Sequence, residues 1–197
     1  MFSDDLKAYY LDQICLMPEY KMCLKRCHHP NIDSIVLHKR KDGSLLRVFV
    51  ATGPVEFGEV AIHSHRFPAD FFVLSGALTN YNVRILKNGP GEILHEWDYH
   101  SPLLGGEGLT YVHPVVAVWD YWDYPQYDSF QMSEWDVHTV SCEAGTSWIV
   151  SEGPEKKKTS RSYTKTAEPF TVEGLYEPMS VEEVNEAVDK IYEAMVG

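Results

Sequence analysis

Three histidines have the residue types and the spacing of a metal site. His63 and His65 are two positions apart in the segment EVAIHSH, whose pattern predicts a β-strand. Side chains two positions apart on a strand point to the same face, so both imidazoles can bind one ion. His138, in the strand-like segment EWDVHTV, is the best candidate for a third ligand. Imidazole ligands suit Fe, Zn, Cu and Ni, and the three residues therefore predict one divalent metal.

The other histidines leave alternatives for the third ligand. The chain has nine histidines, so a pair with this spacing can also arise by chance. The strand-rich surroundings of the pair and the glycine turn at Gly76 favour the metal site. His95, His100 and His113 remain alternatives to His138, although surface positions are the default expectation for these three.

The elements that must position the histidines are short strands. Between residues 32 and 153, roughly nine or ten alternating runs are separated by turn residues, a spacing typical of an all-β barrel or sandwich. Apolar residues at helical spacing predict an N-terminal helix, and a short second helix is expected over 19–27. Ser180 and Glu183 form a capping box that predicts the start of a C-terminal helix.

The sequence therefore predicts three parts. Residues 1–30 form an N-terminal helical extension, and residues 31–153 form the barrel. Residues 154–197 form an extended tail and a C-terminal helix that packs on the barrel.

Charge and cysteine content exclude several classes of function. The net charge of −12 argues against a broad basic face that binds nucleic acid. No stretch approaches the roughly 18 apolar residues of a membrane span, and the segment MFSDDLKAYY lacks the apolar region of a signal peptide. We therefore expect a cytoplasmic protein that binds neither nucleic acid nor membranes. Cys23, Cys27 and His28 lack the second cysteine pair of a zinc knuckle, so structural thiols are expected.

The pattern around the histidines resembles the cupin superfamily. Gly58, His63, His65 and Gly76 match the first cupin motif, G-x5-H-x-H-x3/4-E-x6-G, with one residue fewer after the first glycine. His138 in DVHTV is similar to the single histidine of the second motif. The resemblance implies an RmlC-like jelly-roll barrel, the cupin double-stranded β-helix, with helices at the N-terminal and C-terminal ends.

The resemblance covers roughly residues 32–153 and departs from the cupin pattern at the glutamate. That position falls at Ala69 or Asp70, so Asp70 is a candidate fourth ligand, and otherwise the site has three histidines only. The three-histidine form resembles the thiol dioxygenases among the cupins, through the segments HSHRFPADFFVLSGAL and HTV. The cysteine that some of those enzymes carry corresponds to Asp70 or Phe71, which excludes a cysteine-linked cofactor at that position.

The resemblance implies a mononuclear non-haem iron dioxygenase with a small thiol or carboxylate substrate. Fe(II) is the expected metal, with Zn, Mn or Ni as alternatives. Three neutral histidines leave a positive site with open positions for a substrate, O2 or water. A metal-dependent isomerase, lyase or hydrolase is a second interpretation, and a non-catalytic cupin that binds a small ligand is a third. The fold does not decide among them.

Several polar side chains are candidates for the reaction. Tyr81 and Tyr111 are candidate catalytic residues that would donate a proton or a hydrogen bond, and Tyr121 is a candidate substrate-binding residue. Arg66 and Arg84 are candidates for binding a substrate carboxylate, because a guanidinium offers a planar fork of donors. Arg66 directly follows the histidine pair, so on a regular strand it would face away from the metal.

The aromatic segment DYWDYPQYD, residues 120–128, is expected to be a loop. It would form a lid over the mouth of the barrel, or a contact in a homodimer.

Overall fold

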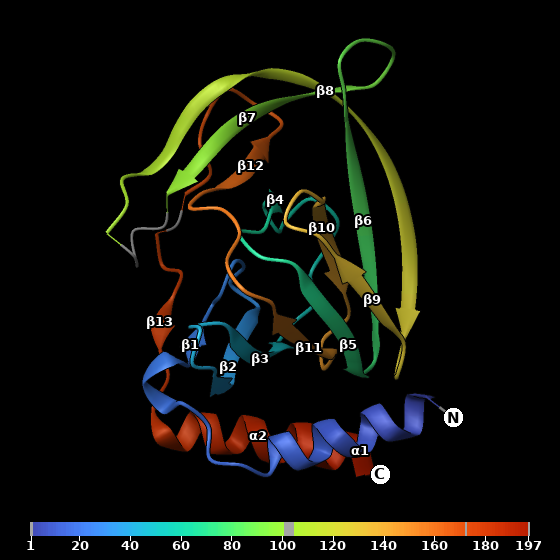
Figure 1. Ribbon diagram of the computed structural model, residues 1–197, viewed down its shortest axis with the longest axis vertical. Coiled ribbons are helices and arrows are strands. Elements are labelled where there is room, and N and C mark those ends of the chain that lie inside the picture. The colour runs from blue at the N-terminus through green and yellow to red at the C-terminus, as the bar shows by residue number, and fades with distance from the viewer. Residues whose placement is uncertain (1, 101–104, 172, 197) are drawn as a thin grey trace.

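The structure is a computed structural model that describes residues 2–100, 105–171 and 173–196 (Figure 1). The helices are α1 (Phe2–Ile14), the 3-10 helix η1 (Tyr20–Met22) and α2 (Val181–Val196). The strands are β1 (Leu24–Lys25), β2 (Ile32–Lys39), β3 (Leu45–Ala51), β4 (Ile62–Ser64), β5 (Ala69–Ser75), β6 (Ala77–Leu86), β7 (Glu92–His100), β8 (Gly108–Pro125), β9 (Ser129–Met132), β10 (Val137–Cys142), β11 (Ser147–Glu152), β12 (Ser160–Thr164) and β13 (Glu177–Pro178). The predicted all-β class with a helix at each end is confirmed.

Two antiparallel sheets carry the fold. The first has the strand order β13-β1-β2-β3-β11-β5-β9, and the strands of the second pair in a closed ring, β10-β4-β12-β7-β8-β6. Strands far apart in the sequence are neighbours, because β3 pairs with β11, β4 with β10, and β5 with both β9 and β11. This nested pairing is that of a double-sheet jelly roll, the architecture that cupins share. The predicted barrel topology is therefore confirmed.

The first sheet is buried on both faces. Side chains alternate along its strands, so on β5 Phe71 packs between the sheets with Trp148, whereas Phe72 faces the helices. Figure 1 shows α1 and α2 side by side across the outer face of this sheet. They cover it with the apolar side chains of Tyr10, Ile14, Val184, Ile191 and Met195. The inner face is left to line the space between the two sheets.

The predicted capping box at the start of α2 is confirmed. The Glu183 backbone N–H donates to Ser180 Oγ at 3.2 Å, and the Ser180 N–H donates to Glu183 Oε2 at 2.8 Å. Glu183 also forms an ion pair with Lys25 of β1 at 2.7 Å. The described residues include no helix that is long and apolar enough to cross a membrane.

Three short strands lie where the sequence predicts a helix or an irregular tail. Instead of a second helix over 19–27, η1 is followed directly by β1. In the tail, β12 pairs with β4 and β7, and β13 pairs with β1. Each of these strands has two to five residues, too few for an alternating pattern to be recognised. The tail therefore contributes to both sheets.

The expected loop over 120–128 is largely strand. β8 extends for 18 residues and ends at Pro125. β6 supplies a pairing partner for every residue from Val116 to Pro125, so the aromatic segment stays in the sheet and forms no lid. A register shift opposite Glu96 and Trp97 leaves Val112 as the extra residue of a bulge, two positions before Pro114.

Candidate metal centre

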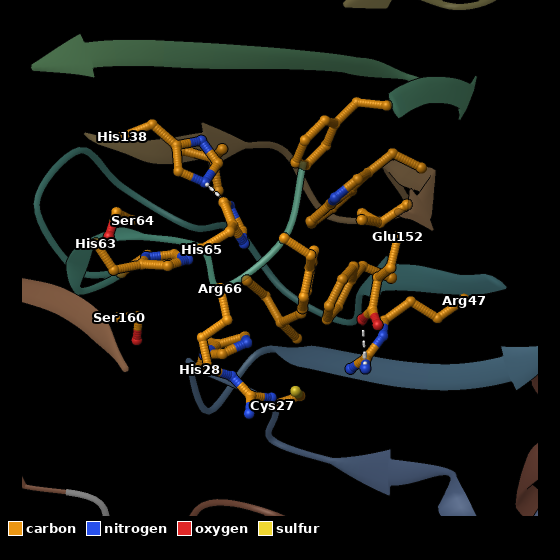
Figure 2. A pocket seen from close by; sticks show the side chains of 18 of the residues that line it. Cys27, His28, Arg47, His63, Ser64, His65, Arg66, His138, Glu152 and Ser160 are labelled. Carbon is orange, nitrogen blue, oxygen red and sulfur yellow. Dashed lines mark hydrogen bonds and ion pairs between the residues drawn. The ribbon is translucent and has the colours of Figure 1, made fainter. Parts of the chain in front are cut away.

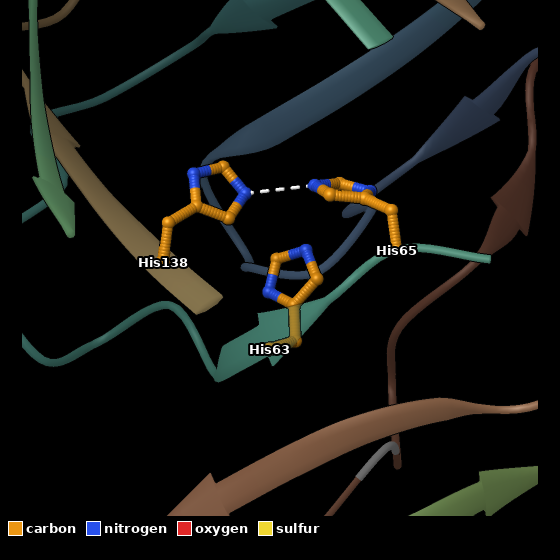
Figure 3. Close-up of side chains that lie close together, drawn as sticks. All are labelled: His63, His65 and His138. Carbon is orange, nitrogen blue, oxygen red and sulfur yellow. Dashed lines mark hydrogen bonds between the residues drawn. The ribbon is translucent and has the colours of Figure 1, made fainter. Parts of the chain in front are cut away.

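Strand pairing brings the three histidines together. His63 is the middle residue of β4, and His138 on β10 is its direct cross-strand partner. His65 follows two positions after His63, and Figure 3 shows its ring directed towards His138. One ligand atom from each residue lies within 4.8 Å of the other two. We call these three residues the three-histidine group.

The spacing within the group fits an ion. The Nε2 atoms of His65 and His138 are 2.9 Å apart. Two nitrogens bound to one ion at about 2.1 Å, roughly at right angles, are also about 3 Å apart. Without an ion, neutral His65 can donate a hydrogen bond from Nε2 to His138 Nε2 across this distance. The same spacing also allows both nitrogens to bind one ion once that proton is lost.

Hydrogen bonds orient two of the rings. His63 Nδ1–H donates to the Ala61 carbonyl at 2.8 Å, and His138 Nδ1 lies 2.6 Å from Asn80 Oδ1. Asn80 Nδ2 donates to Asn82 Oδ1 at 3.0 Å, which directs Asn80 Oδ1 towards His138. Both neutral rings thus carry their proton on Nδ1 and present the Nε2 lone pair to the group. Outer hydrogen bonds of this kind are typical of metal-binding histidines.

Burial keeps the three imidazoles neutral. Desolvation lowers the pKa of His63, and it lowers the pKa values of His65 and His138 well below 6.5. Neighbouring imidazoles lower the last two further, because a second positive charge beside a first is unfavourable. At neutral pH the group is in the protonation state that binds a cation.

The three-histidine group lines a cavity of about 220 Å³ between the sheets (Figure 2). Apolar and aromatic side chains from the inner face of the first sheet form much of its wall, among them Phe49, Phe71 and Trp148. The rings of Phe49 and Trp148 stack with their centroids 5.6 Å apart. Pockets for drug-sized ligands have about 300–1,000 Å³, so this cavity has room only for a smaller molecule.

A charged pair lies in the same cavity, on the side away from His138 (Figure 2). Arg47 Nη2 is 2.6 Å from Glu152 Oε1, and Glu152 is buried. Burial raises the pKa of Glu152, and the Arg47 guanidinium opposes that rise. The Arg47 Nε is buried and has no hydrogen-bond partner in the described part of the chain. The pair therefore places a cation with a spare donor in a largely apolar wall.

Arg66 lines the cavity, whereas Arg84 does not. Arg66 forms an ion pair with Glu155 at 2.8 Å, and it reaches the cavity because β4 ends at Ser64, before strand alternation could turn Arg66 away. Arg84 is exposed on β6 and pairs with Asp120 at 3.1 Å. Its predicted role in substrate binding has no support from its position.

The three candidate tyrosines lie away from the three-histidine group. Tyr81 and Tyr121 are cross-strand partners on β6 and β8. Because Asn80 faces His138, alternation turns Tyr81 to the opposite face, where its hydroxyl lies 3.2 Å from Ser141 Oγ. Tyr121 is exposed on that same face. Tyr111 is exposed as well, with its hydroxyl 3.3 Å from the Nδ1 of His95.

Asp70 does not join the three-histidine group. On β5 the neighbouring residues Ala69 and Phe71 are buried between the sheets, so alternation turns Asp70 to the helix side. Its carboxylate is exposed there and accepts a hydrogen bond from Gln131 Nε2 at 2.7 Å. Among the described residues the ligand set therefore consists of three histidines without a carboxylate.

The sequence did not predict several cavity residues. Arg47 could have been found, because alternation places it on the same strand face as Phe49, where a charge is unusual. Cys27 is buried, and burial raises the pKa of its thiol to about 11, which fits the predicted structural role. His28 and Tyr176 also line the cavity, and nothing in the local pattern of the tail indicates Tyr176.

No protein-family model matches the chain, and no curated protein matches it. Among solved structures, a Streptomyces Pac13 structure with uridine is similar, with 9% identity, a TM-score of 0.40 and coverage of 78% of this chain and 97% of that one. Hydroxypropylphosphonic acid epoxidase from S. wedmorenis has 14% identity, a TM-score of 0.36 and coverage of 68% and 56%. A protein of unknown function from Vibrio parahaemolyticus has 13% identity, a TM-score of 0.34 and coverage of 66% and 96%. Similarity at this level carries no argument about the reaction of this chain.

Proposed function

We propose that His63, His65 and His138 bind one divalent metal, with Fe(II) as the expected ion. The protein is then a mononuclear non-haem iron dioxygenase of the cupin type that acts on a small thiol or carboxylate substrate. The observation that carries the proposal is the convergence of three neutral imidazoles on the wall of a small cavity. Two of the rings are oriented by hydrogen bonds so that Nε2 is the free ligand atom.

The side chains around the site support an anionic substrate. When bound, Fe(II) supplies redox chemistry and a positive charge that neutral ligands do not cancel. Phe49, Phe71 and Trp148 limit the access of water to the cavity. Arg47 and Arg66 place guanidinium groups in its wall, each paired with a glutamate, and guanidinium donors suit the acceptor atoms of carboxylates.

The donor set also supports a second function. Three histidines are the ligands of a catalytic zinc ion in carbonic anhydrase, where a metal-bound water reacts without a change of oxidation state. With Zn, Mn or Ni in the site, the protein would be an isomerase, lyase or hydrolase. Without turnover, it would bind a small ligand.

Elemental analysis of the purified protein tests the site. We expect one equivalent of metal in the wild type and in His95→Ala, because His95 lies on β7 outside the three-histidine group. We expect the metal to be lost in His63→Ala and His138→Ala. Metal content that is unchanged in these two variants would overturn the assignment.

Oxygen consumption tests the reaction. Fe(II)-loaded protein is incubated with a panel of small thiols and carboxylates, and uptake of O2 that depends on one of them supports the dioxygenase. Stoichiometric Zn, Mn or Ni in the purified protein, with no uptake of O2 after iron loading, would favour the second function instead.

A further inference from the structure

His28 and Tyr176 form a pair beside the proposed metal ligands. His28 Nδ1 and the Tyr176 hydroxyl are 3.1 Å apart, and both side chains line the cavity. The ring of His28 stacks on that of His63, with 5.5 Å between the centroids and 16° between the planes. Figure 2 shows His28 below His63, across from His138. His28 is not part of the three-histidine group.

The backbone holds both residues in a conformation that side chains rarely adopt. The φ angle is +68° at His28 and +62° at Tyr176. Their two segments are joined by β1 and β13, by the Tyr176 N–H that donates to the Arg26 carbonyl at 3.1 Å, and by an ion pair of Arg26 with Glu177 at 2.9 Å. Strained residues persist where the surrounding structure fixes them, and they are concentrated at functional sites.

The pair keeps one hydrogen-bond donor after its internal bond is made. If the Tyr176 hydroxyl donates to His28 Nδ1, the neutral imidazole carries its proton on Nε2. If Nδ1 donates instead, the hydroxyl hydrogen is free. Within the described part of the chain, neither group has a further hydrogen-bond partner. Both His28 and Tyr176 line the cavity, so either remaining donor is accessible to a bound molecule.

We propose that the His28–Tyr176 pair donates a hydrogen bond to the molecule that occupies an open position of the metal. The pair thereby selects ligands with an anionic acceptor atom. This inference rests on the proposed metal site, but it assigns a different task to different residues. The metal ligands come from the β4 segment and β10, whereas the donor comes from the segments next to β1 and β13.

Azide binding to the Co(II)-loaded protein tests the inference. Azide is an anion that binds metals and accepts hydrogen bonds, and its binding to Co(II) changes the visible spectrum. The variants are Tyr176→Phe, which removes the hydroxyl, and His28→Asn, which replaces the imidazole with a residue that tolerates positive φ. Tyr99→Phe is the matched control, because it removes a hydroxyl from another tyrosine of the same cavity.

We expect all variants to bind Co(II) with an affinity within about twofold of the wild type. The azide Kd should rise about tenfold in Tyr176→Phe and in His28→Asn, because a hydrogen bond to a charged acceptor is lost, and it should not change in Tyr99→Phe. Because the two residues act as one unit, the double variant should weaken azide binding no more than either single variant.

The outcomes separate the two proposals. If the wild type binds no Co(II), the metal site is wrong. If Co(II) binds and azide binds equally well to the wild type, Tyr176→Phe and His28→Asn, the metal site stands and the role of the pair is wrong. If Tyr176→Phe fails to fold, the azide titration of His28→Asn tests the role of the pair alone, with the same expected rise in the azide Kd.

Discussion

Among single residues, Asn80 decides how His138 presents its lone pair. Its Oδ1 lies 2.6 Å from His138 Nδ1 and fixes the tautomer. We expect Asn80→Ala to weaken metal binding about 10- to 100-fold, because the ring loses the partner that orients it. A competition titration with a chelator measures the change. Asn185→Ala is the control, because Asn185 accepts a hydrogen bond from Tyr20 at the surface. Equal metal affinities in Asn80→Ala and Asn185→Ala would show that packing alone orients the His138 ring.

The two ion pairs of the cavity differ in burial, so breaking them should lower the free energy of unfolding by different amounts. Glu152→Ala leaves the half-buried Arg47 without its partner, so the free energy of unfolding should fall by about 3 kcal/mol. Glu155→Ala removes the exposed partner of Arg66 and should lower the free energy of unfolding by less than about 1 kcal/mol. Urea denaturation measures both. Similar small losses would mean that water in the cavity solvates Arg47.

The histidines also determine how the stability of the metal-free protein depends on pH. Their pKa values are lowered in the folded state, so below about pH 6.5 the unfolded chain binds more protons than the folded one. Their contribution is therefore full above pH 6.5 and is lost as the pH falls towards the folded pKa values, by about 1.4 kcal/mol per pH unit for each proton. Urea unfolding between about pH 7.5 and 5.5 should show this slope. A slope that is unchanged in a His63→Gln, His138→Gln double variant would contradict the explanation.

Among the elements, the turn from β5 to β6 shows why the sequence carries a glycine there. Gly76 has a φ of +71°, and a Cβ atom would lie 2.6 Å from Thr146 Oγ1 and 3.1 Å from Thr146 Cα. Gly43, in the turn from β2 to β3, has a φ of +89° and would meet no described atom within 4 Å. We expect Gly43→Ala to lower the free energy of unfolding by about 1 kcal/mol and Gly76→Ala to lower it clearly more. Thermal denaturation measures the stability of both variants. Equal losses of stability would mean that Thr146 moves to make room for the added Cβ atom.

Strand patterns predicted the histidines of the site, but not which face of a strand the other candidate residues occupy. Alternation shows that His63 and His65 share a face, and the structure brings that face to the cavity. It does not show which face of β6 points inwards, and Tyr81 lies on the outer one. On β5, both faces are largely apolar because the sheet is covered by helices, so the pattern could not place Asp70.

For the molecule as a whole, metal binding and folding are linked. An ion that binds the folded chain alone raises its free energy of unfolding by about 2.7 kcal/mol when the free ion is at 100 times its Kd. We therefore expect Fe(II) or Zn to raise the melting temperature of the wild type and of His95→Ala to the same extent. His63→Ala should show no rise, and an equal rise there would place the ion elsewhere.

An all-β barrel or sandwich was predictable from turn and strand spacing, and the jelly roll from the resemblance to cupins. The completion of the two sheets by the chain ends was not predictable. β1, β12 and β13 are defined by partners far away in the sequence, and each has only two to five residues. For this reason the sequence could not show that the extension and the tail supply His28 and Tyr176 to the cavity. Local patterns identify elements with an apolar face, but not short strands that depend on pairing.

The pairing of β1 with β13 also sets an order of events during synthesis. Arg26 and Glu177 are 151 positions apart, and the chain is made from its N-terminus. The ribosome therefore releases all three histidines well before it releases the segment that carries Tyr176. The segments of Phe49 and Phe71 are also made earlier, so the part of the cavity wall that depends on Tyr176 is the last to be completed.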